Sequence, residues 1–445
     1  MIRRLLTARR CSVLLLYGCG TTVDPVGYNE ATGFGGADGV SGAGAASGGV
    51  SGAGGAGAAS GAGGETAARR LRPLRGPSSY PNAFRDLLGK TEAQITARID
   101  EAFEQLFHGN PSTEAIYFEK GDGAYIRDIL HDDIRTEGMG LGMMITLQLN
   151  RREEFDRLWR YSRDQLQFMS GENRGYFRSR CDTLDGDTIE CIDPYGLQQF
   201  VMALVLAHGR WGSSGQIDYE SAAFSLFDVM RNKEAENGGI KAGVTNTFDA
   251  QTNLVFDVPH ESAASFTRPS VIMPAYYELW ALATGESFYG DAAVSGRSYW
   301  RLVANPTTGL MPTRASLKGQ PLDDWNTFSS SGFRTHFNLV LDAIWTTSDP
   351  WVIQQSDRTL AFFADEGIDS YGSSYTLDGM RLRPDRDQAL IVSNGALALI
   401  SQHEERSAFV ERVWEQPVVM FEPRYYAGVL HLLSLTLLGG RFRVY

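Results

Sequence analysis

The sequence predicts an all-α globular body, and three observations lead to that prediction. Beyond about Pro77 the apolar residues recur with the i, i+3, i+4, i+7 period of amphipathic helices, and few segments alternate as strands do. Residues 78–445 leave room for about a dozen helices of ordinary length joined by short connections. The chain contains no glycine-rich phosphate loop, nucleophile elbow or His-Glu-x-x-His motif, which would indicate other folds. The period alone fits a ring of helices and a solenoid equally well.

The leader, residues 1–19, predicts export. Four arginines within the first ten residues precede an apolar run at 13–16, an order typical of a signal peptide. The end of the leader, Leu16-Tyr17-Gly18-Cys19, resembles a bacterial lipobox, in which Cys19 becomes the lipidated first residue. We therefore expect a membrane-anchored lipoprotein, periplasmic or at the cell surface. The alternatives are an ordinary cleaved signal and a misassigned start.

Residues 20–77 predict a flexible tether. From Gly33 to Gly64 the chain is almost entirely Gly, Ala and Ser, and such a segment has nothing apolar to bury that would offset its ordering entropy. Because an anchored protein needs reach from its membrane, the tether also favours lipidation. No later stretch has the roughly 18 apolar residues of a membrane span, so the lipid would be the only membrane contact.

Net charge and cysteine content exclude some classes of binding partner and cofactor. The formal net charge of −12 argues against nucleic acid, because no basic surplus exists to neutralise phosphates. Cys181 and Cys191 lie close together in a Gly/Asp-rich loop, and in an oxidising compartment they predict a disulfide worth about 2–3 kcal/mol. A metal site is the weaker interpretation, because no further Cys or His stands nearby at zinc spacing. We expect neither a metal nor another cofactor.

Several helices begin, end and pack at recognisable signals. Thr91 and Gln94 form a capping box, and Asn150 with Glu153 behind it predicts a second helix start. The pair Gly439-Gly440 ends the last helix. The apolar stripes are Ile95, Ile99, Ala102, Phe103 and Leu106; Phe155, Leu158, Trp159 and Leu166; Phe200, Ala203, Leu204, Ala207 and Trp211; Phe337, Val340, Leu341, Ile344 and Trp345; and Val429, Leu432, Leu433 and Leu437.

A resemblance decides between the ring and the solenoid. The stretch from Tyr125 to Met144, YIRDILHDDIRTEGMGLGMM, resembles the signature of glycoside hydrolase family 8, nearest its branch of exo-oligoxylanases that release xylose from the reducing end. Further similar blocks follow in family order: Glu101–Phe107, Glu154–Trp159, Phe200–Leu204, Pro274–Trp280, Asn305–Leu310, Arg424–Gly428 and Gly440–Arg443. The resemblance implies an (α/α)6 double-ring barrel with a sugar-binding cleft at one end.

The resemblance also implies an inverting mechanism with two carboxyl groups. A protonated acid delivers a proton to the departing glycosidic oxygen, and a carboxylate about 6.5–9.5 Å away takes a proton from water. Glu137, in Arg-Thr-Glu-Gly-Met-Gly, matches the family's acid. The alternative is a helix-start glutamate that complements the helix dipole. The substrate-binding residues implied in the same way are Tyr125, Arg135, Arg334, Tyr425 and Tyr426.

At the family's base position this chain carries an alcohol. The branch has an aspartate three residues before an arginine, and the corresponding segment 329–334, SSSGFR, places Ser331 there. A hydroxyl is too weak a base to take a proton from water near neutral pH, and loss of a positioned base commonly lowers the rate by roughly 10²- to 10⁴-fold. Substitute bases are Asp323 or Asp324 in the preceding loop, or Asp193. The alternative for the first two is a solvated loop position.

Other cleft positions of the branch are replaced as well. Its Asp-Gly-Glu-Glu reads Tyr-Gly-Leu-Gln at 195–198, its aromatic-His pair reads Val-Ile at 271–272, and its Tyr-Tyr-Asp-Gly reads Tyr-Tyr-Ala-Gly at 425–428. Core-forming residues are kept while cleft residues change, which is the pattern of a scaffold retained without its original chemistry.

Two functions fit this pattern. The first is an inverting glycoside hydrolase for β-linked oligo- or polysaccharides of the xylan or β-glucan type, weakened or altered by loss of the usual base. The second is a non-catalytic, lipid-anchored glycan-binding pseudoenzyme that uses the same cleft. A purely structural surface protein has no positive feature in its favour.

Overall fold

The computed structural model describes residues 69–182, 188–346 and 349–445, with the backbone alone at 181–182 and 188–191. The leader, Cys19 and nearly all of the predicted tether lie outside the described residues, as do the side chains of Cys181 and Cys191. Lipidation and the disulfide therefore stay predictions. Among the described residues, no helix is both long and apolar enough to cross a bilayer.

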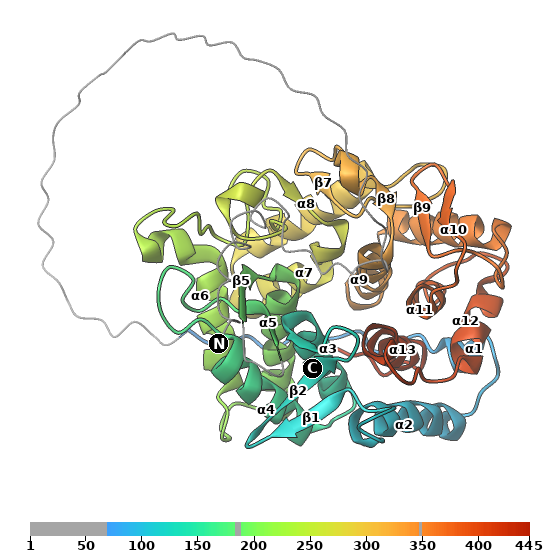
Figure 1. Ribbon diagram of the computed structural model, residues 1–445, viewed down its shortest axis with the longest axis horizontal. Helices are drawn as coiled ribbons and strands as arrows, with labels where there is room; N and C mark the ends of the chain where they lie inside the picture. Colours follow the sequence, from blue (N-terminus) through green and yellow to red (C-terminus); the bar gives the residue numbers. More distant parts are fainter. Residues whose placement is uncertain (1–68, 183–187, 347–348) are drawn as a thin grey trace, which may run out of the picture. The chain divides into compact units, whose positions relative to one another are not determined.

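The described helices form two concentric rings (Figure 1). The inner helices are α3 (Thr136–Gln148), α5 (Pro194–Trp211), α7 (Pro274–Thr284), α9 (Phe333–Trp345), α11 (Gln388–Leu397) and α13 (Arg424–Leu438). The outer helices are α2 (Glu92–His108), α4 (Arg152–Tyr161), α6 (Tyr219–Asn237), α8 (Ser287–Val303), α10 (Pro350–Asp365) and α12 (Arg406–Glu415), and a short helix, α1 (Ala83–Asp86), precedes them. Each inner helix contacts the next one, and α13 contacts α3, so the inner ring closes. The predicted all-α (α/α)6 barrel is confirmed.

Burial follows the two rings. Every residue of α3 is buried, and so is every residue of α9 except Ala343. A helix that is apolar on all sides must be surrounded by other helices. The outer helix α8 instead buries one stripe: Tyr289, Ala292, Ala293, Gly296, Tyr299, Trp300 and Val303. The apolar stripes predicted from the sequence are all buried except for Trp211, which is partly buried and packs edge-on against Phe155.

Helix starts show one confirmed and one wrong cap. The capping box of Thr91 and Gln94 is present at the start of α2. Asn150 does not cap α4, because Arg151 occupies the N-cap position. Asn150 itself lies in the left-handed region, with φ +60°, and its side-chain oxygen accepts hydrogen bonds from Trp211 and from Arg210, both at 2.9 Å. A side chain that serves a neighbouring helix is not available to cap its own.

The prediction that the body is helical throughout is wrong between residues 117 and 192. A five-stranded antiparallel sheet lies there, in the order β1 (Tyr117–Lys120), β2 (Gly123–Asp128), β3 (Asp133–Arg135), β4 (Arg178–Asp182) and β5 (Thr188–Ile192). The register pairs Phe118 with Tyr125 and Arg135 with Arg180. Strands of three to six residues are too short to show a clear two-residue period in the sequence. The third strand leads directly into α3.

Two smaller sheets are built by connections between the helices. One pairs β6 (Phe266–Thr267) with β7 (Ala315–Ser316). The other has the order β10 (Arg381–Arg383), β9 (Ser374–Thr376) and β8 (Thr327–Phe328). Strand β8 lies directly before the turn that contains Ser331, so this sheet supports the segment that leads into α9.

The globular body begins before residue 78. Leu71 is buried, and its backbone N–H donates to the carboxylate of Glu220 at 2.7 Å. Arg70 pairs with the same carboxylate at 2.6 Å, and the N–H of Arg72 donates to the carbonyl of Ala283. The predicted end of the tether at residue 77 is therefore several residues too late.

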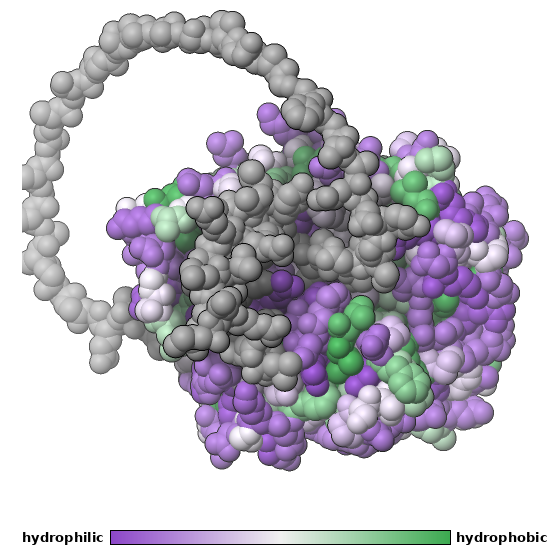
Figure 2. Space-filling view, in the orientation of Figure 1, coloured by the Kyte–Doolittle hydropathy of each residue, from purple (hydrophilic) through white to green (hydrophobic). Residues whose placement is uncertain are grey.

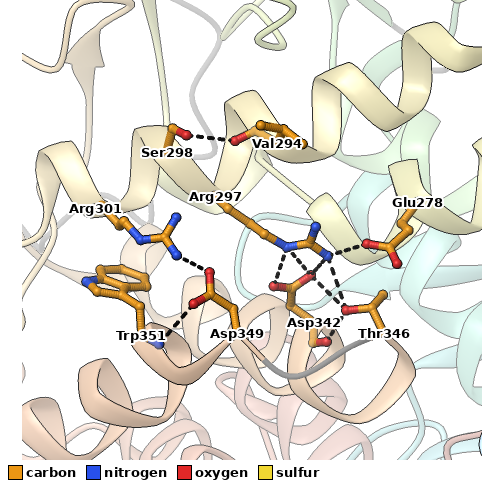
Figure 3. A network of polar contacts seen from close by, with 9 residues as sticks. All are labelled: Glu278, Val294, Arg297, Ser298, Arg301, Asp342, Thr346, Asp349 and Trp351. Atoms are coloured by element: carbon orange, nitrogen blue, oxygen red, sulfur yellow. Dashed lines mark hydrogen bonds and ion pairs between the residues drawn. The ribbon is translucent and has the colours of Figure 1, made fainter.

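A buried ion cluster ties the outer helix α8 to the last turn of α9 (Figure 3). The guanidinium of Arg297 donates to both oxygens of Asp342, at 2.8 and 2.9 Å. It also donates to Glu278 of α7 at 2.6 Å and to Thr346 at 3.1 Å. Since Asp342 is almost fully buried, this cluster fixes the three helices α7, α8 and α9 relative to one another.

Candidate active site

The first turns of the inner helices converge at one end of the barrel. Glu137 is the second residue of α3 and Arg334 the second of α9, and the two side chains form an ion pair. Tyr426, in the first turn of α13, donates its hydroxyl to the carbonyl of Ser330 at 2.6 Å. The carbonyl of Val271, just before α7, accepts from Gln198 in the first turn of α5 at 2.9 Å. The starts of these five helices therefore lie together around the predicted acid, Glu137.

The ion pair between Glu137 and Arg334 is buried on both sides. Glu137 is 2% exposed and Arg334 is fully buried. Burial by itself would lower the pKa of the Arg334 guanidinium, but the charge of Glu137 and those of the surrounding tyrosine and aspartate side chains together raise it. A neighbouring guanidinium stabilises a carboxylate rather than a carboxylic acid. A glutamate that is to deliver a proton must therefore first be released from this arginine.

Tyr195 takes the space beside Arg334. The guanidinium lies over the Tyr195 ring at 4.2 Å from its centroid, a cation–π contact. Burial raises the pKa of the Tyr195 hydroxyl, and the charge of Arg334 opposes that rise. The Tyr195 ring thus holds the arginine by its face and offers it no second negative charge.

Two hydroxyl groups, one beside Glu137 and one three residues before Arg334 in the chain, have no hydrogen-bond partner among the described residues. They are the Oη of Tyr425 and the Oγ of Ser331, and both atoms are shielded from solvent. The Tyr425 ring lies against Gly138, where an added Cβ would be 2.7 Å from the ring, so only glycine permits this approach. Burial raises the pKa of the Tyr425 hydroxyl and the charge of Glu137 adds to it, so the group remains a neutral donor. Unpartnered hydroxyls at this place suit a sugar hydroxyl or a water molecule.

Two of the residues predicted to bind substrate are engaged elsewhere. The guanidinium of Arg135 donates to Asp133 at 2.9 and 3.2 Å and pairs with Asp128 at 3.2 Å. Tyr125 packs against Phe118 and Tyr161, with ring centroids at 5.8 and 5.1 Å. Arg135 therefore stabilises the end of β3, which leads into α3, through ion pairs with aspartates of the sheet. Tyr125 belongs to an aromatic cluster on the sheet.

The three substitute bases lie in different surroundings. Asp323 and Asp324 are exposed on a short 3₁₀ turn, Asp323–Trp325. Asp193 is buried at the N-cap of α5 and accepts from the backbone N–H groups of Tyr195 and Gly196, both at 3.1 Å. Burial raises the pKa of Asp193, the nearby Arg268 opposes this, and the charge of Glu137 raises it further. Of the three carboxylates, Asp193 is the one within electrostatic reach of Glu137.

Sequence reasoning missed the buried charges behind Asp193. Arg268 lies 3.6 Å from Asp193 and also forms an ion pair with Asp257. Arg314 contacts the second oxygen of Asp257 at 3.0 Å. These residues lie in connections between helices, where the apolar period gives no signal, and no motif links their positions in the chain.

The chain is similar to known proteins over most of its length. Residues 117–438 match the family described as Glycosyl hydrolases family 8. The chain is 32% identical over 382 residues to the reducing-end xylose-releasing exo-oligoxylanase Rex8A of Paenibacillus barcinonensis, which covers 82% of this chain and 97% of that protein. It is 31% identical to the reducing end xylose-releasing exo-oligoxylanase of Halalkalibacterium halodurans, with coverage of 82% and 94%. A Rex8A mutant in complex with an arabinofuranosyl-xylotetraose is similar with a TM-score of 0.76 at 31% identity, over 82% of this chain and 97% of that one.

Proposed function

The chain belongs to glycosyl hydrolases family 8, and we propose that it acts on β-linked xylo-oligosaccharides as a slow, inverting glycoside hydrolase. The observation that carries this proposal is the position of Glu137, which is kept at the start of α3 and faces the first turn of α9. Relatives named for the release of xylose from oligoxylans support xylose as the sugar.

In this proposal Glu137 protonates the departing glycosidic oxygen. Arg334 must then exchange Glu137 for another partner, and a bound sugar hydroxyl can accept a hydrogen bond from the guanidinium. Ser331 can orient the attacking water but cannot remove its proton, so the rate stays roughly 10²- to 10⁴-fold below that of an enzyme with a positioned base. Asp193 is buried, and its pKa is affected by the charge of Glu137. In this proposal it is the carboxylate that takes the proton from water during residual turnover.

A second candidate function is glycan binding without catalysis. Two observations favour it: Arg334 already occupies the carboxylate of Glu137, and the alcohol at position 331 leaves the attacking water without a base at the usual position. The hydroxyls of Ser331 and Tyr425, which have no partner within the described part of the chain, serve binding as well as they serve hydrolysis.

The test uses the full-length protein and its Glu137→Gln variant with xylotetraose. Glutamine keeps the size of the side chain and an oxygen for Arg334 but carries no transferable acidic proton. We expect slow release of xylose by the wild type, at least about 10²-fold less by the variant, and similar binding of both by calorimetry. Binding without turnover in both proteins would establish the second candidate, and absence of binding in both would contradict the two together.

A further inference from the structure

An exposed aromatic side chain stands just before α13. Phe421 is 60% exposed, and its backbone has φ +63°, in the left-handed region that disfavours bulky residues. Leu130, on the turn between β2 and β3, and the adjoining Met420 are exposed too. Figure 2 shows apolar surface gathered over the part of this face where Figure 1 places α3 and α13.

The strained backbone of Phe421 is held by a buried arginine. Arg424, 2% exposed, donates to the carbonyl of Phe421 at 2.7 Å and to those of Ala115 and Pro111 at 2.9 and 3.1 Å. The N–H of Phe421 donates to the carbonyl of Thr113 at 2.8 Å. The connection between α2 and β1 thus fixes the position of this loop through three hydrogen bonds, and the bond from Arg424 to the Phe421 carbonyl braces the loop from within.

Neither feature of Phe421 helps the fold. A left-handed conformation destabilises a residue with a Cβ, and an exposed ring gains little from burial. Backbone strain that the surroundings enforce is typical of binding and catalytic positions. The ring is held outward at the expense of stability, which points to a partner for its face.

The place of Phe421 identifies that partner. It precedes Tyr425 by four residues, so the chain between them spans at most about 14 Å, and Tyr425 lies beside Glu137. The ring therefore lies within the length of a short oligosaccharide from the reacting centre. The face of a pyranose ring, which carries C–H groups, is the part of such a ligand that packs on an aromatic ring.

We propose that Phe421 is an outer sugar-binding platform that makes the protein prefer longer β-linked oligosaccharides. This inference rests on the proposed function, because it takes its ligand class from it. The platform is a specificity-determining residue: it contacts a sugar unit remote from the bond that reacts, and short ligands do not reach it.

The test compares short and long ligands on the full-length protein by calorimetry. With Phe421→Ala we expect xylohexaose binding to weaken by about 5- to 10-fold while xylobiose binding stays unchanged. Phe421→Gly should weaken xylohexaose binding equally without lowering the melting temperature, since glycine adopts φ +63° without strain. The control is Leu282→Ala, which removes a similarly exposed apolar side chain, 57% exposed, from the last turn of α7.

Each other result overturns the inference in a distinct way. Unchanged xylohexaose binding, or an equal loss for both sugars, would show that Phe421 is no outer platform. A lower melting temperature of Phe421→Gly with a parallel loss of binding would assign the residue a structural role. If the wild type bound neither sugar, the proposed function itself would fail, and the platform with it.

Discussion

The two ends of helix α9 carry charged side chains that are buried alike but partnered differently. In the last turn, Asp342 receives two hydrogen bonds from Arg297, which is held in turn by Glu278 and Thr346. Acceptors and donors match there, and the cluster needs no further group. This is the arrangement of a structural clamp.

In the first turn the match is incomplete. Arg334 pairs with Glu137 and stacks on Tyr195, while the hydroxyls of Ser331 and Tyr425 have no partner among the described residues. A buried hydroxyl left without a partner costs about 1–3 kcal/mol, so a protein keeps such groups where a ligand or water completes them. The difference between the two ends separates the binding end of the barrel from its structural end.

Breaking the structural end should have the largest effect on stability. In Asp342→Asn the guanidinium of Arg297 loses a charged partner. We expect the free energy of unfolding to fall by about 3 kcal/mol, the lower end for a buried pair, because the Arg297 side chain is 15% exposed. Urea unfolding measures the loss, and calorimetry on the folded protein should find xylotetraose binding unchanged. A fall in affinity without a fall in stability would reverse the roles assigned to the two ends.

Between the ends, His336 makes the stability of the helix depend on pH. It is buried, its ring stacks on Phe328 at 5.7 Å, its Nδ1 has no partner among the described residues, and burial lowers its pKa to about 3. The unfolded chain takes up a proton near pH 6.5 that the folded protein refuses, so stability is full above that pH and falls as the pH decreases towards 3.

Replacing His336 with leucine should remove this pH dependence of stability. Between pH 7 and pH 5 the wild type should lose about 2 kcal/mol more of unfolding free energy than His336→Leu. Urea unfolding of both proteins at the two pH values gives the difference directly, and any constant change caused by repacking cancels. Equal losses would mean that His336 is hydrated or partnered in the folded protein.

The sequence predicted the rings better than the site. Apolar stripes such as Phe337 to Trp345 report burial in any helix, so the helices and their inner faces could be predicted from period alone. The short strands around Asp133 could not, because three residues carry no period. The resemblance located Glu137 and Ser331, but it gave no sign of the ion pair of Glu137 with Arg334, which lies 197 positions away in the chain.

The role proposed for Phe421 could not be predicted from the sequence either. The sequence around Phe421 gives no sign of a special role. Only the backbone angle and the three hydrogen bonds from the Arg424 side chain indicate that the ring is held outward. Contacts that join loops far apart in the chain are set by tertiary packing, which single-sequence patterns do not encode.

The most direct test of the account is the turnover of xylotetraose by Ser331→Asp. The new carboxylate would lie one helical turn before Arg334, where it can both activate water and draw the guanidinium away from Glu137. We expect Ser331→Asp to turn over xylotetraose at least about 10²-fold faster than the wild type. The uncharged control Ser331→Asn should show no gain. The same rate in all three proteins, or an equal gain in both variants, would contradict the claim that a missing base limits this site.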